Sequence, residues 1–312
     1  MKNVVRKIGV LFRDGVSKNL KDLEKYKQIK SDIICLNQKI NNARNYLLRL
    51  NPNEQNAETT EIIKFVENNN LYMMYAHDFI KEYNPININV LTDEECNMNY
   101  VVHNNKRLYF PQAFDTENCR NYYCSLCVEQ DHRSPHRYDT PEYSPKIGDV
   151  IADIGAAEGV WALAHVETAG KIYLFECEQE WITALQKTFE PWKDKVEIVN
   201  KFISDTTNEK CITFDDFIKD KEINVIKADI EGAEQAMLRG CAQTLSRREK
   251  DDLKLLLCTY HKSDDAENIK SILEESGFAT EFSKGYLVVY WDDKEPYLRK
   301  GVIRAQKKNK WR

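Results

Sequence analysis

Acidic side chains and glycines gather at the end of one apolar run in the middle of the chain. Residues 153–159 read Asp-Ile-Gly-Ala-Ala-Glu-Gly, directly after apolar residues 150–152 and directly before a helix-like pattern. A strand, a glycine turn and a helix N-terminus place backbone N–H groups at the carboxyl edge of a sheet, where small residues let a ligand approach closely. We therefore expect a cofactor to bind Asp153, Gly155, Ala156 and Gly159.

The acid at the start of this run indicates which cofactor fits. The spacing is Gly-x-x-x-Gly, and it lacks the third glycine of the Gly-x-Gly-x-x-Gly pattern that holds a pyrophosphate. The carboxylate of Asp153 suits the cationic amino group of a methionine moiety better than a phosphate. The run therefore favours S-adenosylmethionine over the dinucleotide of an oxidoreductase, and a tight turn without a ligand is the alternative.

A second acid stands where a ribose would lie. The apolar run 171–175 predicts a strand that ends at Glu176, about twenty residues beyond the first glycine turn, where an acid can accept both ribose hydroxyls. Glu178 is the fallback for this role. An acid placed at a helix N-terminus only for its favourable charge is the alternative for either residue.

Two further strand ends supply candidate catalytic groups. One apolar run leads into Asp229-Ile230-Glu231-Gly232, and another ends shortly before His261. The carboxyl ends of parallel strands face the active cleft, so we expect Asp229, Glu231 and His261 beside the transferred methyl group. His261 or Asp229 would take the proton of an attacking hydroxyl, although a histidine in a surface loop is the alternative. The two carboxylates could also hold a divalent metal, which the reaction does not require.

Apolar runs alternate with helical patterns from residue 148 onward, which is typical of βαβ units in a parallel sheet. We expect strands near 149–154, 171–176, 195–200, 223–229, 253–259, 278–282 and 286–291. The helices between them are expected near 159–169, 178–189, 233–247 and 265–276. About three residues join the last two strands, too few for a crossover helix, so that pair is predicted to be an antiparallel hairpin. The prediction is a doubly wound, Rossmann-like α/β sheet, mostly parallel with one antiparallel strand.

Several of these motifs stand together in an order that resembles the FkbM family of methyltransferases. They are Asp-Ile-Gly-Ala-x-x-Gly, Phe175-Glu176, Thr213-Phe214-Asp215-Asp216 and Lys227-x-Asp229-Ile230-Glu231-Gly232-Ala233-Glu234, and the resemblance covers about 140–292. It implies a class I S-adenosylmethionine enzyme that methylates a hydroxyl of a sugar or glycan, in a surface polysaccharide or a natural product. Asp205 joins the expected cofactor-binding residues. Cys177 replaces a usual proline, and Thr259-Tyr260 stands where an acid is usual before His261, which leaves the base open.

The rest of the chain divides by composition. Residues 1–85 predict helices with a break near residues 51–53, residues 86–145 a connector that faces the substrate, 146–295 the cofactor domain and 296–312 a basic tail. In the connector we expect His132, His136 and Arg137 to contact the acceptor. A zinc site is the alternative use of the two histidines, together with Cys119, Cys124 and Cys127.

Composition narrows the class of protein. The 312 residues carry a net charge of −5, which gives no sign of nucleic-acid binding. No apolar run is long enough to span a membrane or to act as an export signal, so we expect a cytoplasmic chain with free thiols. A homo-oligomer formed through the N-terminal helices is possible on this pattern. The rival hypotheses are a scaffold that binds the cofactor without catalysis and a methyltransferase for a nucleic acid or a lipid.

Overall fold

The structure is a computed structural model that describes residues 20–51, 56–71, 73–219, 221–246, 253–292 and 294–307. The chain forms two compact units. One contains Met1–Ile80 with Tyr286–Arg299, and the other contains Lys81–Gly285 with Lys300–Arg312. None of the described helices is both long enough and apolar enough to cross a membrane.

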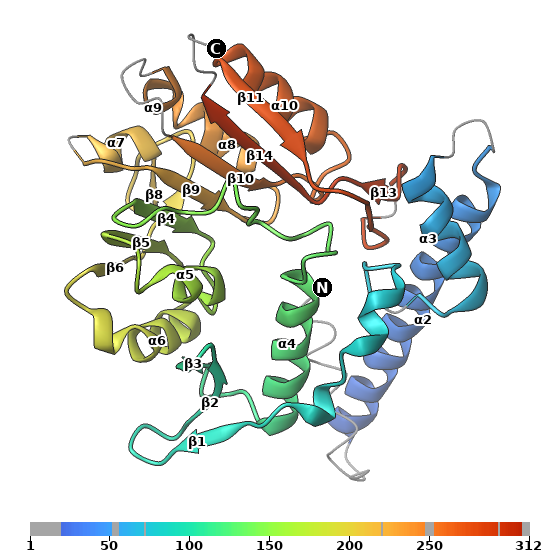
Figure 1. The fold of residues 1–312 in the computed structure, drawn as a ribbon. Coiled ribbons are helices and arrows are strands. Elements are labelled where there is room, and N and C mark those ends of the chain that lie inside the picture. The colour runs from blue at the N-terminus through green and yellow to red at the C-terminus, as the bar shows by residue number, and fades with distance from the viewer. Residues whose placement is uncertain are drawn as a thin grey trace. The chain divides into compact units, whose positions relative to one another are not determined.

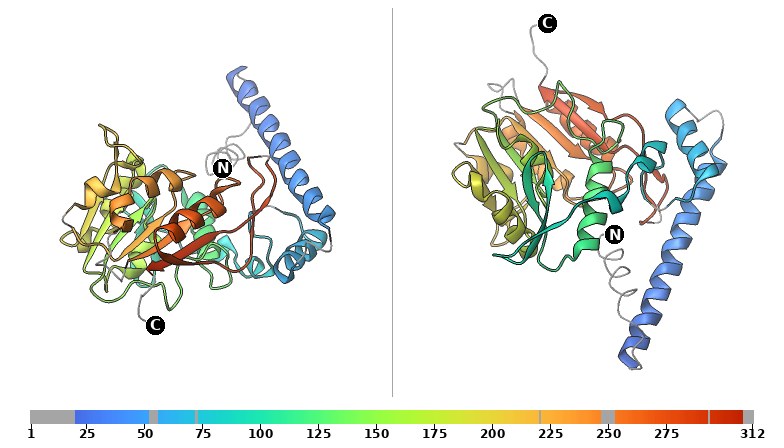
Figure 2. Two further views of the ribbon diagram at one scale, coloured as in Figure 1. Left: turned by 90° about the horizontal axis from the view of Figure 1, so that it is seen from above. Right: turned by 60° about the horizontal axis from the view of Figure 1, so that its bottom comes forward.

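The first unit is built on two helices. The long helix α2 spans Leu20–Arg49 (Figure 2), and α3 spans Ala57–Asn68 after Asn56, whose side chain accepts from the Thr59 N–H. Buried apolar side chains on both helices hold them together: Ala43, Leu47, Ile62 and Val66. The strands β12 (Leu287–Val288) and β13 (Leu298–Arg299) pair antiparallel in the same unit. Both helices lie within residues 1–85, which were expected to be helical, and residues 52 and 53 of the expected break lie outside the described residues.

A seven-stranded sheet forms the centre of the second unit, in the order β11-β14-β10-β9-β4-β5-β6 (Figure 1). The strands are β4 (Val150–Ile154), β5 (Lys171–Phe175), β6 (Val196–Val199), β9 (Val225–Ala228), β10 (Lys254–Cys258), β11 (Phe278–Phe282) and β14 (Val302–Lys307). The five strands from β10 to β6 run parallel, while β14 lies antiparallel between β10 and β11. The predicted mostly parallel, doubly wound α/β fold is confirmed.

Helices cover both faces of this sheet (Figure 1). One face carries α5 (Val160–His165) and α6 (Gln179–Thr188), and the other carries α7 (Phe214–Ile218), α8 (Glu234–Arg239), α9 (Ala242–Ser246) and α10 (Asp265–Glu275). Alternate strand residues such as Ile154, Phe175 and Leu257 pack against Met237 and Leu273 of the second group. Because the strands β10, β9, β4, β5 and β6 run parallel, their carboxyl ends lie at one edge of the sheet.

The antiparallel strand does not come from the segment that the sequence suggests. We predicted a hairpin of 278–282 with 286–291, but β11 pairs with β14 instead. The expected basic tail, 296–312, therefore supplies a central strand. Arg304 can lie buried in this strand because its guanidinium donates to the carbonyl oxygens of Tyr138 and Arg137. Lys308, Lys310 and Arg312 of the expected tail lie outside the described residues.

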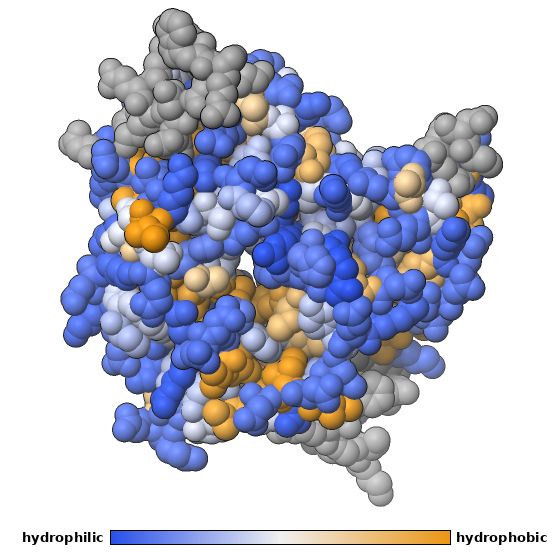
Figure 3. Space-filling view, in the orientation of Figure 1, coloured by the Kyte–Doolittle hydropathy of each residue, from blue (hydrophilic) through white to orange (hydrophobic). Residues whose placement is uncertain are grey.

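The connector is more regular than its sequence indicates. At its start Pro85–Asn87 forms a 3-10 turn, in which the Asn84 side chain accepts from the Ile86 N–H. A small antiparallel sheet follows, made of β1 (Leu91–Asp93), β2 (Met98–His103) and β3 (Lys106–Tyr109), and then α4 (Thr116–Glu129). Figure 3 shows apolar residues in the lower half of the view, the part in which Figure 1 draws β1, β2, β3 and α4.

Candidate functional site

The turn after β4 is shaped by contacts with the end of β9. Gly155 has a φ of 74°, and a Cβ built on it would lie 2.1 Å from the Asp229 carbonyl oxygen. Only glycine fits there, because both the dihedral angle and the space exclude a side chain. The sequence explained Gly155 by the approach of a cofactor, whereas the structure explains it by the approach of the neighbouring strand. Gly159, also at a φ of 74°, lies against Leu185 and Phe189 of the α6 region.

Glu176 holds this turn from the next strand. One carboxylate oxygen accepts from the Ala157 N–H at 2.8 Å, and the other accepts from the N–H groups of Cys177 and Glu178 at 2.6 and 2.8 Å. Three backbone donors thus fix the orientation of one carboxylate at the carboxyl end of β5. A carboxylate has about four lone-pair sites, so the group keeps capacity for a ligand hydroxyl. Glu178 is exposed and makes no such side-chain contact as the N-cap of α6.

Asp153 is buried below the turn and already has a partner within the chain. It is 1% exposed, and its Oδ1 lies 2.8 Å from the Lys227 Nζ. Burial raises the pKa of Asp153, and the ammonium of Lys227 opposes that rise. Lys227 also donates to the Gly155 carbonyl at 3.0 Å. The pair therefore braces the turn. The sequence suggested the amino group of a methionine moiety as the partner of Asp153, whereas in the structure its partner is the buried ammonium group of Lys227.

The ends of β9 and β10 bring a second acid next to two histidines. Asp229 Oδ1 lies 3.3 Å from His261 Nε2, and Asp229 Oδ2 lies 3.8 Å from His136 Nε2. The Tyr138 hydroxyl donates to Oδ2 at 3.1 Å. Burial alone would raise the pKa of Asp229, but His261, His136 and Lys227 hold it well below its ordinary value. Asp229 is thus an ionised carboxylate at neutral pH.

His261 lies between two carboxylates. Its Nε2 faces Asp229, and its Nδ1 lies 3.1 Å from Oε1 of the fully buried Glu234. Burial lowers the pKa of His261, but the two carboxylates outweigh burial and raise it to about 10. His261 is therefore an imidazolium near neutral pH, and neither ring nitrogen offers a lone pair to a substrate proton. The sequence suggested His261 as a general base, which requires a neutral imidazole. The charged ring in the structure cannot play that role.

Glu231 and Glu234 follow Asp229 but differ in burial. The Glu231 side chain is 82% exposed, and its Oε2 lies 3.9 Å from His261 Nε2. Glu231 has a φ of 54°, which a non-glycine residue adopts only at a cost. Glu234 starts α8 as expected, yet its carboxylate turns back and accepts from the Ile230 N–H at 2.9 Å. Glu234 thus fixes both the turn and His261.

The three residues predicted to contact the acceptor go to different places. His136 is buried and reaches the Asp229 group. His132 is exposed and lies 3.4 Å from Asp131. Arg137 donates to the carbonyl oxygens of Gln130 and Asp139 and so braces its own segment. Of the three, only His136 lies with the expected catalytic residues.

Three further residues complete this group. They are Tyr138, Cys258 and Tyr260. Cys258 is the last residue of β10, so its exit at the sheet edge could have been read from the strand pattern. Tyr138 stands 91 positions before its partner Asp229, and no local pattern indicates that contact.

Asp205 is exposed and pairs with Arg239, at 2.9 Å from its Nη2. Arg239 lowers the pKa of Asp205. The Asp205 carboxylate accepts from the side chains of Arg239 and Ser204. Its role in binding the cofactor stays a prediction.

The expected zinc alternative does not assemble within the described part of the chain. Cys119, Cys124 and Cys127 lie along α4, and burial raises the pKa of each thiol. Among the described residues, two other groups have donor atoms close enough together to hold an ion. They are His136 with Asp229 and Cys258, and Asp229 with Glu234 and His261.

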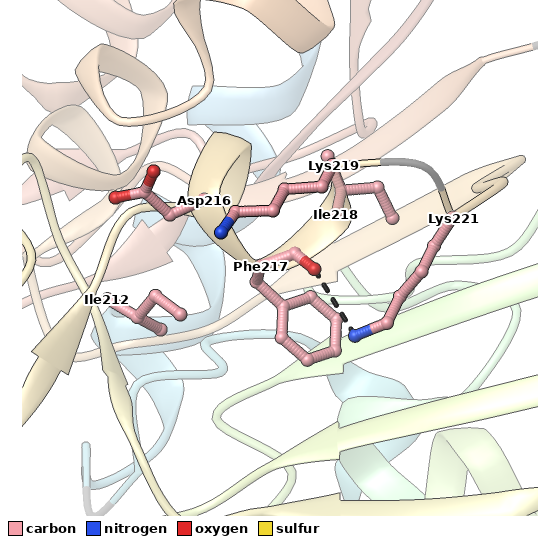
Figure 4. A pocket seen from close by; sticks show the side chains of 6 residues that line it. All are labelled: Ile212, Asp216, Phe217, Ile218, Lys219 and Lys221. Atoms are coloured by element: carbon pink, nitrogen blue, oxygen red, sulfur yellow. Dashed lines mark hydrogen bonds between the residues drawn. The ribbon is translucent and has the colours of Figure 1, made fainter.

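A separate hollow lies beside α7 (Figure 4). Ile212, Asp216, Phe217, Ile218, Lys219 and Lys221 line it. Lys221 donates to the Phe217 carbonyl and lies over the Phe217 ring, 3.6 Å from its centroid. Lys221 precedes the start of β9 and therefore belongs to the amino end of the sheet, away from Asp229. We do not assign the cofactor to this hollow.

Comparison with known proteins gives a family match over the central residues. Residues 162–282 match the family described as Methyltransferase FkbM domain. Similar solved structures include the methyltransferase FkbM from Methylobacillus flagellatus KT, with 16% identity, a TM-score of 0.43 and coverage of 62% of this chain and 55% of that one. The match thus spans about half the length of the Methylobacillus chain.

Two further similar structures are a precorrin-6y C5,15-methyltransferase from Geobacter metallireducens GS-15 and an rRNA methylase from Streptococcus thermophilus. The first has 15% identity, a TM-score of 0.38 and coverage of 54% of this chain and 84% of that one. The second has 13% identity, a TM-score of 0.39 and coverage of 53% and 89%. No curated protein matches the chain.

Proposed function

We propose that this chain transfers a methyl group from S-adenosylmethionine to a hydroxyl of a sugar or glycan. The match of residues 162–282 to the family described as Methyltransferase FkbM domain supports the proposal. The observation that carries the proposal is the convergence of the turn after β4, Glu176 and Asp229 at one sheet edge. This edge is where open α/β sheets bind their ligands.

The turn and Glu176 form the cofactor side of the proposed site. Glu176 would accept a ribose hydroxyl with the lone-pair site that its three backbone donors leave. Gly155, Ala156 and Gly159 would present backbone to the methionine moiety. We propose that Asp153 acts through its pair with Lys227, by fixing the turn, and not by touching the ammonium group itself.

Asp229 is the proposed contact to the acceptor hydroxyl. His261 holds one of its oxygens, and the ionised carboxylate accepts the hydrogen bond of the hydroxyl with the other. As the bond between oxygen and methyl forms, the bond between methyl and sulfur breaks, S-adenosylhomocysteine leaves, and the hydroxyl proton passes to Asp229 and on to solvent. The low pKa of Asp229 makes it a weak base, so we assign most of the acceleration to alignment of hydroxyl, methyl and sulfur. His261 and Glu234 then act as positioning residues, and Glu231 stands at the exposed rim.

The acceptor, the compartment and the assembly also belong to this proposal. We propose a glycan acceptor that contacts Asp229, in a cytoplasmic enzyme. A nucleic-acid acceptor is disfavoured by the net charge of −5. The exposed apolar residues Ile34 and Leu48 of α2 support a homo-oligomer formed through that helix.

Transfer of labelled methyl groups tests the function directly. The full chain is incubated with methyl-labelled S-adenosylmethionine and a panel of neutral and acidic oligosaccharides, an RNA pool and lipid vesicles. We expect label in an oligosaccharide and stability of that label to mild alkali, because a methyl ether resists hydrolysis that cleaves a methyl ester.

Two results would contradict this proposal. Label in the RNA pool or in lipid with none in any oligosaccharide would overturn the glycan acceptor. Binding of S-adenosylhomocysteine without transfer to any member of the panel would favour the scaffold. An Asp229→Asn variant that retained wild-type turnover on a labelled oligosaccharide would remove Asp229 from the proposed mechanism.

A further inference from the structure

Three donor atoms of different chemistry meet where β9, β10 and residues 134–138 come together. His136 Nε2 lies 3.7 Å from Cys258 Sγ and 3.8 Å from Asp229 Oδ2. These atoms and Asp229 all lie within 4.8 Å of one another. His136 is 1% exposed and Cys258 is fully buried, so water does not compete for these atoms as it does at a surface.

The two separations from His136 are slightly wider than those of ligands around one small cation. Tetrahedral zinc binds sulfur at about 2.3 Å and nitrogen or oxygen at about 2.0 to 2.2 Å, which places neighbouring ligand atoms roughly 3.3 to 3.6 Å apart. The Tyr138 hydroxyl lies beside the fourth corner, at 3.1 Å from Asp229 Oδ2 and 3.5 Å from Cys258 Sγ. Small adjustments of His136, Asp229 and Cys258 would bring three ligands to bonding distance and leave the fourth corner open.

We propose that His136, Asp229 and Cys258 bind one divalent transition-metal ion of the zinc class, with the fourth position beside the Tyr138 hydroxyl. Nitrogen, oxygen and sulfur ligands together select such an ion over magnesium or calcium, which prefer oxygen alone. Tyr260 lies 3.1 Å from His136 Nε2 and would give up that contact when the ion binds. Contact of His261 with the other oxygen of Asp229 would orient the ligand, as second-sphere groups do in metal sites.

The proposed ion lies at the contact that we assign to the acceptor. An acceptor hydroxyl bound at the fourth position would lose its proton more easily, because a bound cation lowers the pKa of a coordinated oxygen acid. This consequence rests on the proposed function. The metal site itself does not, because it follows from the four side chains alone.

Cobalt titration tests the site without an acceptor. The full chain, stripped of metal and reduced, is titrated with Co²⁺ while absorbance is recorded. We expect one Co²⁺ per chain, with a thiolate-to-cobalt band in the near ultraviolet and the intense visible bands of a tetrahedral ion. Cys258→Ser is expected to remove the thiolate band, and His136→Ala to weaken cobalt binding at least tenfold.

The controls separate this site from other thiols and from the cofactor site. Cys241→Ser, at a fully buried cysteine of the α8–α9 turn, is expected to keep the bands, and so is a Cys124→Ser, Cys127→Ser double variant of α4. Asp229→Asn serves as a second ligand variant should Cys258→Ser fail to fold, and it is expected to weaken cobalt binding. S-adenosylhomocysteine binding is measured on each variant in parallel.

The proposal is overturned when the folded wild type binds less than one tenth of an equivalent of Co²⁺. It is also overturned when the thiolate band survives in folded Cys258→Ser but disappears in the α4 double variant. Cobalt binding without S-adenosylhomocysteine binding would support the metal site while it contradicts the proposed function. The reverse pattern would contradict the metal site alone.

Discussion

The turn after β4 and the charged group after β9 and β10 lie at one edge of the same sheet, but different forces hold them. In the turn, a glycine fits against a neighbouring carbonyl and one carboxylate binds three backbone N–H groups. In the charged group, side chains from three distant segments hold one another through ion pairs and hydrogen bonds.

The two regions are therefore expected to respond differently to substitutions and to pH. A site fixed by backbone geometry fails when a side chain is added. A site fixed by paired charges fails when one partner is lost, and its stability follows the titration of its members. The predictions below test this contrast in order of expected effect.

Gly155→Ala is expected to have the largest effect. The added Cβ would meet the Asp229 carbonyl oxygen at 2.1 Å, and φ is 74°. We expect a loss of about 3 kcal/mol or more in the free energy of unfolding, measured by urea denaturation. Gly148→Ala is the matched control, because Gly148 has a φ of 87° but nothing within 4 Å of its Cβ. It is expected to lose about 1 kcal/mol; equal losses in the two variants would contradict the close approach.

Lys227→Met tests the buried pair. It leaves the Asp153 carboxylate buried without its cation, which costs about 3 to 5 kcal/mol at neutral pH. The pKa of Asp153 is then raised further, the folded chain binds this proton more tightly than the unfolded chain, and stability rises as the pH falls. Urea denaturation between pH 5 and pH 8 measures this. A double variant that adds Asp153→Asn should recover part of the loss; no recovery would argue against the pair.

Glu176→Gln is expected to act mainly on cofactor binding. An amide offers one acceptor oxygen in place of two, so it cannot serve the backbone donors and the ribose together. We expect S-adenosylhomocysteine binding to weaken by about 1 to 3 kcal/mol in calorimetry. Glu178→Gln, at an exposed neighbour, is the control and should leave the Kd unchanged. A larger effect at Glu178 would move the ribose contact to that residue.

Glu234→Gln is expected to have the smallest effect on stability and a clear effect on titration. His261 has a pKa of about 10 against an ordinary 6.5. Its contribution to stability is therefore complete below about pH 6.5 and is lost as the pH rises through about 10. Removal of one carboxylate should move the pKa of His261 toward its ordinary value, observed by NMR of the ring nitrogens. An unchanged pKa would mean that Asp229 alone holds the proton.

The turn after β4 and the position of Glu176 can be predicted from the sequence, because the residues that indicate them are close together in the chain. The run 153–159 and the acid at 176 follow directly from strand ends and glycine spacing. The strand β14 escapes the same reasoning, because its basic residues suggest a solvated tail. Only the distant carbonyl oxygens of Arg137 and Tyr138 explain how Arg304 lies in the sheet.

The charged region is predicted in part. Asp229 and His261 follow strands and so can be placed at the sheet edge. The charge of His261 cannot be inferred in that way, because it depends on two carboxylates and on burial in the folded chain. The contacts of Tyr138 and His136 span more than ninety positions, and periodicity within one element carries no information about them.

Calorimetry of the full wild-type chain with S-adenosylhomocysteine and with NAD tests the central claim most directly. The account predicts one S-adenosylhomocysteine per chain, bound through the turn after β4 and Glu176, and no heat of binding for NAD. Binding of NAD, or the absence of S-adenosylhomocysteine binding by a chain shown to be folded, would contradict the account.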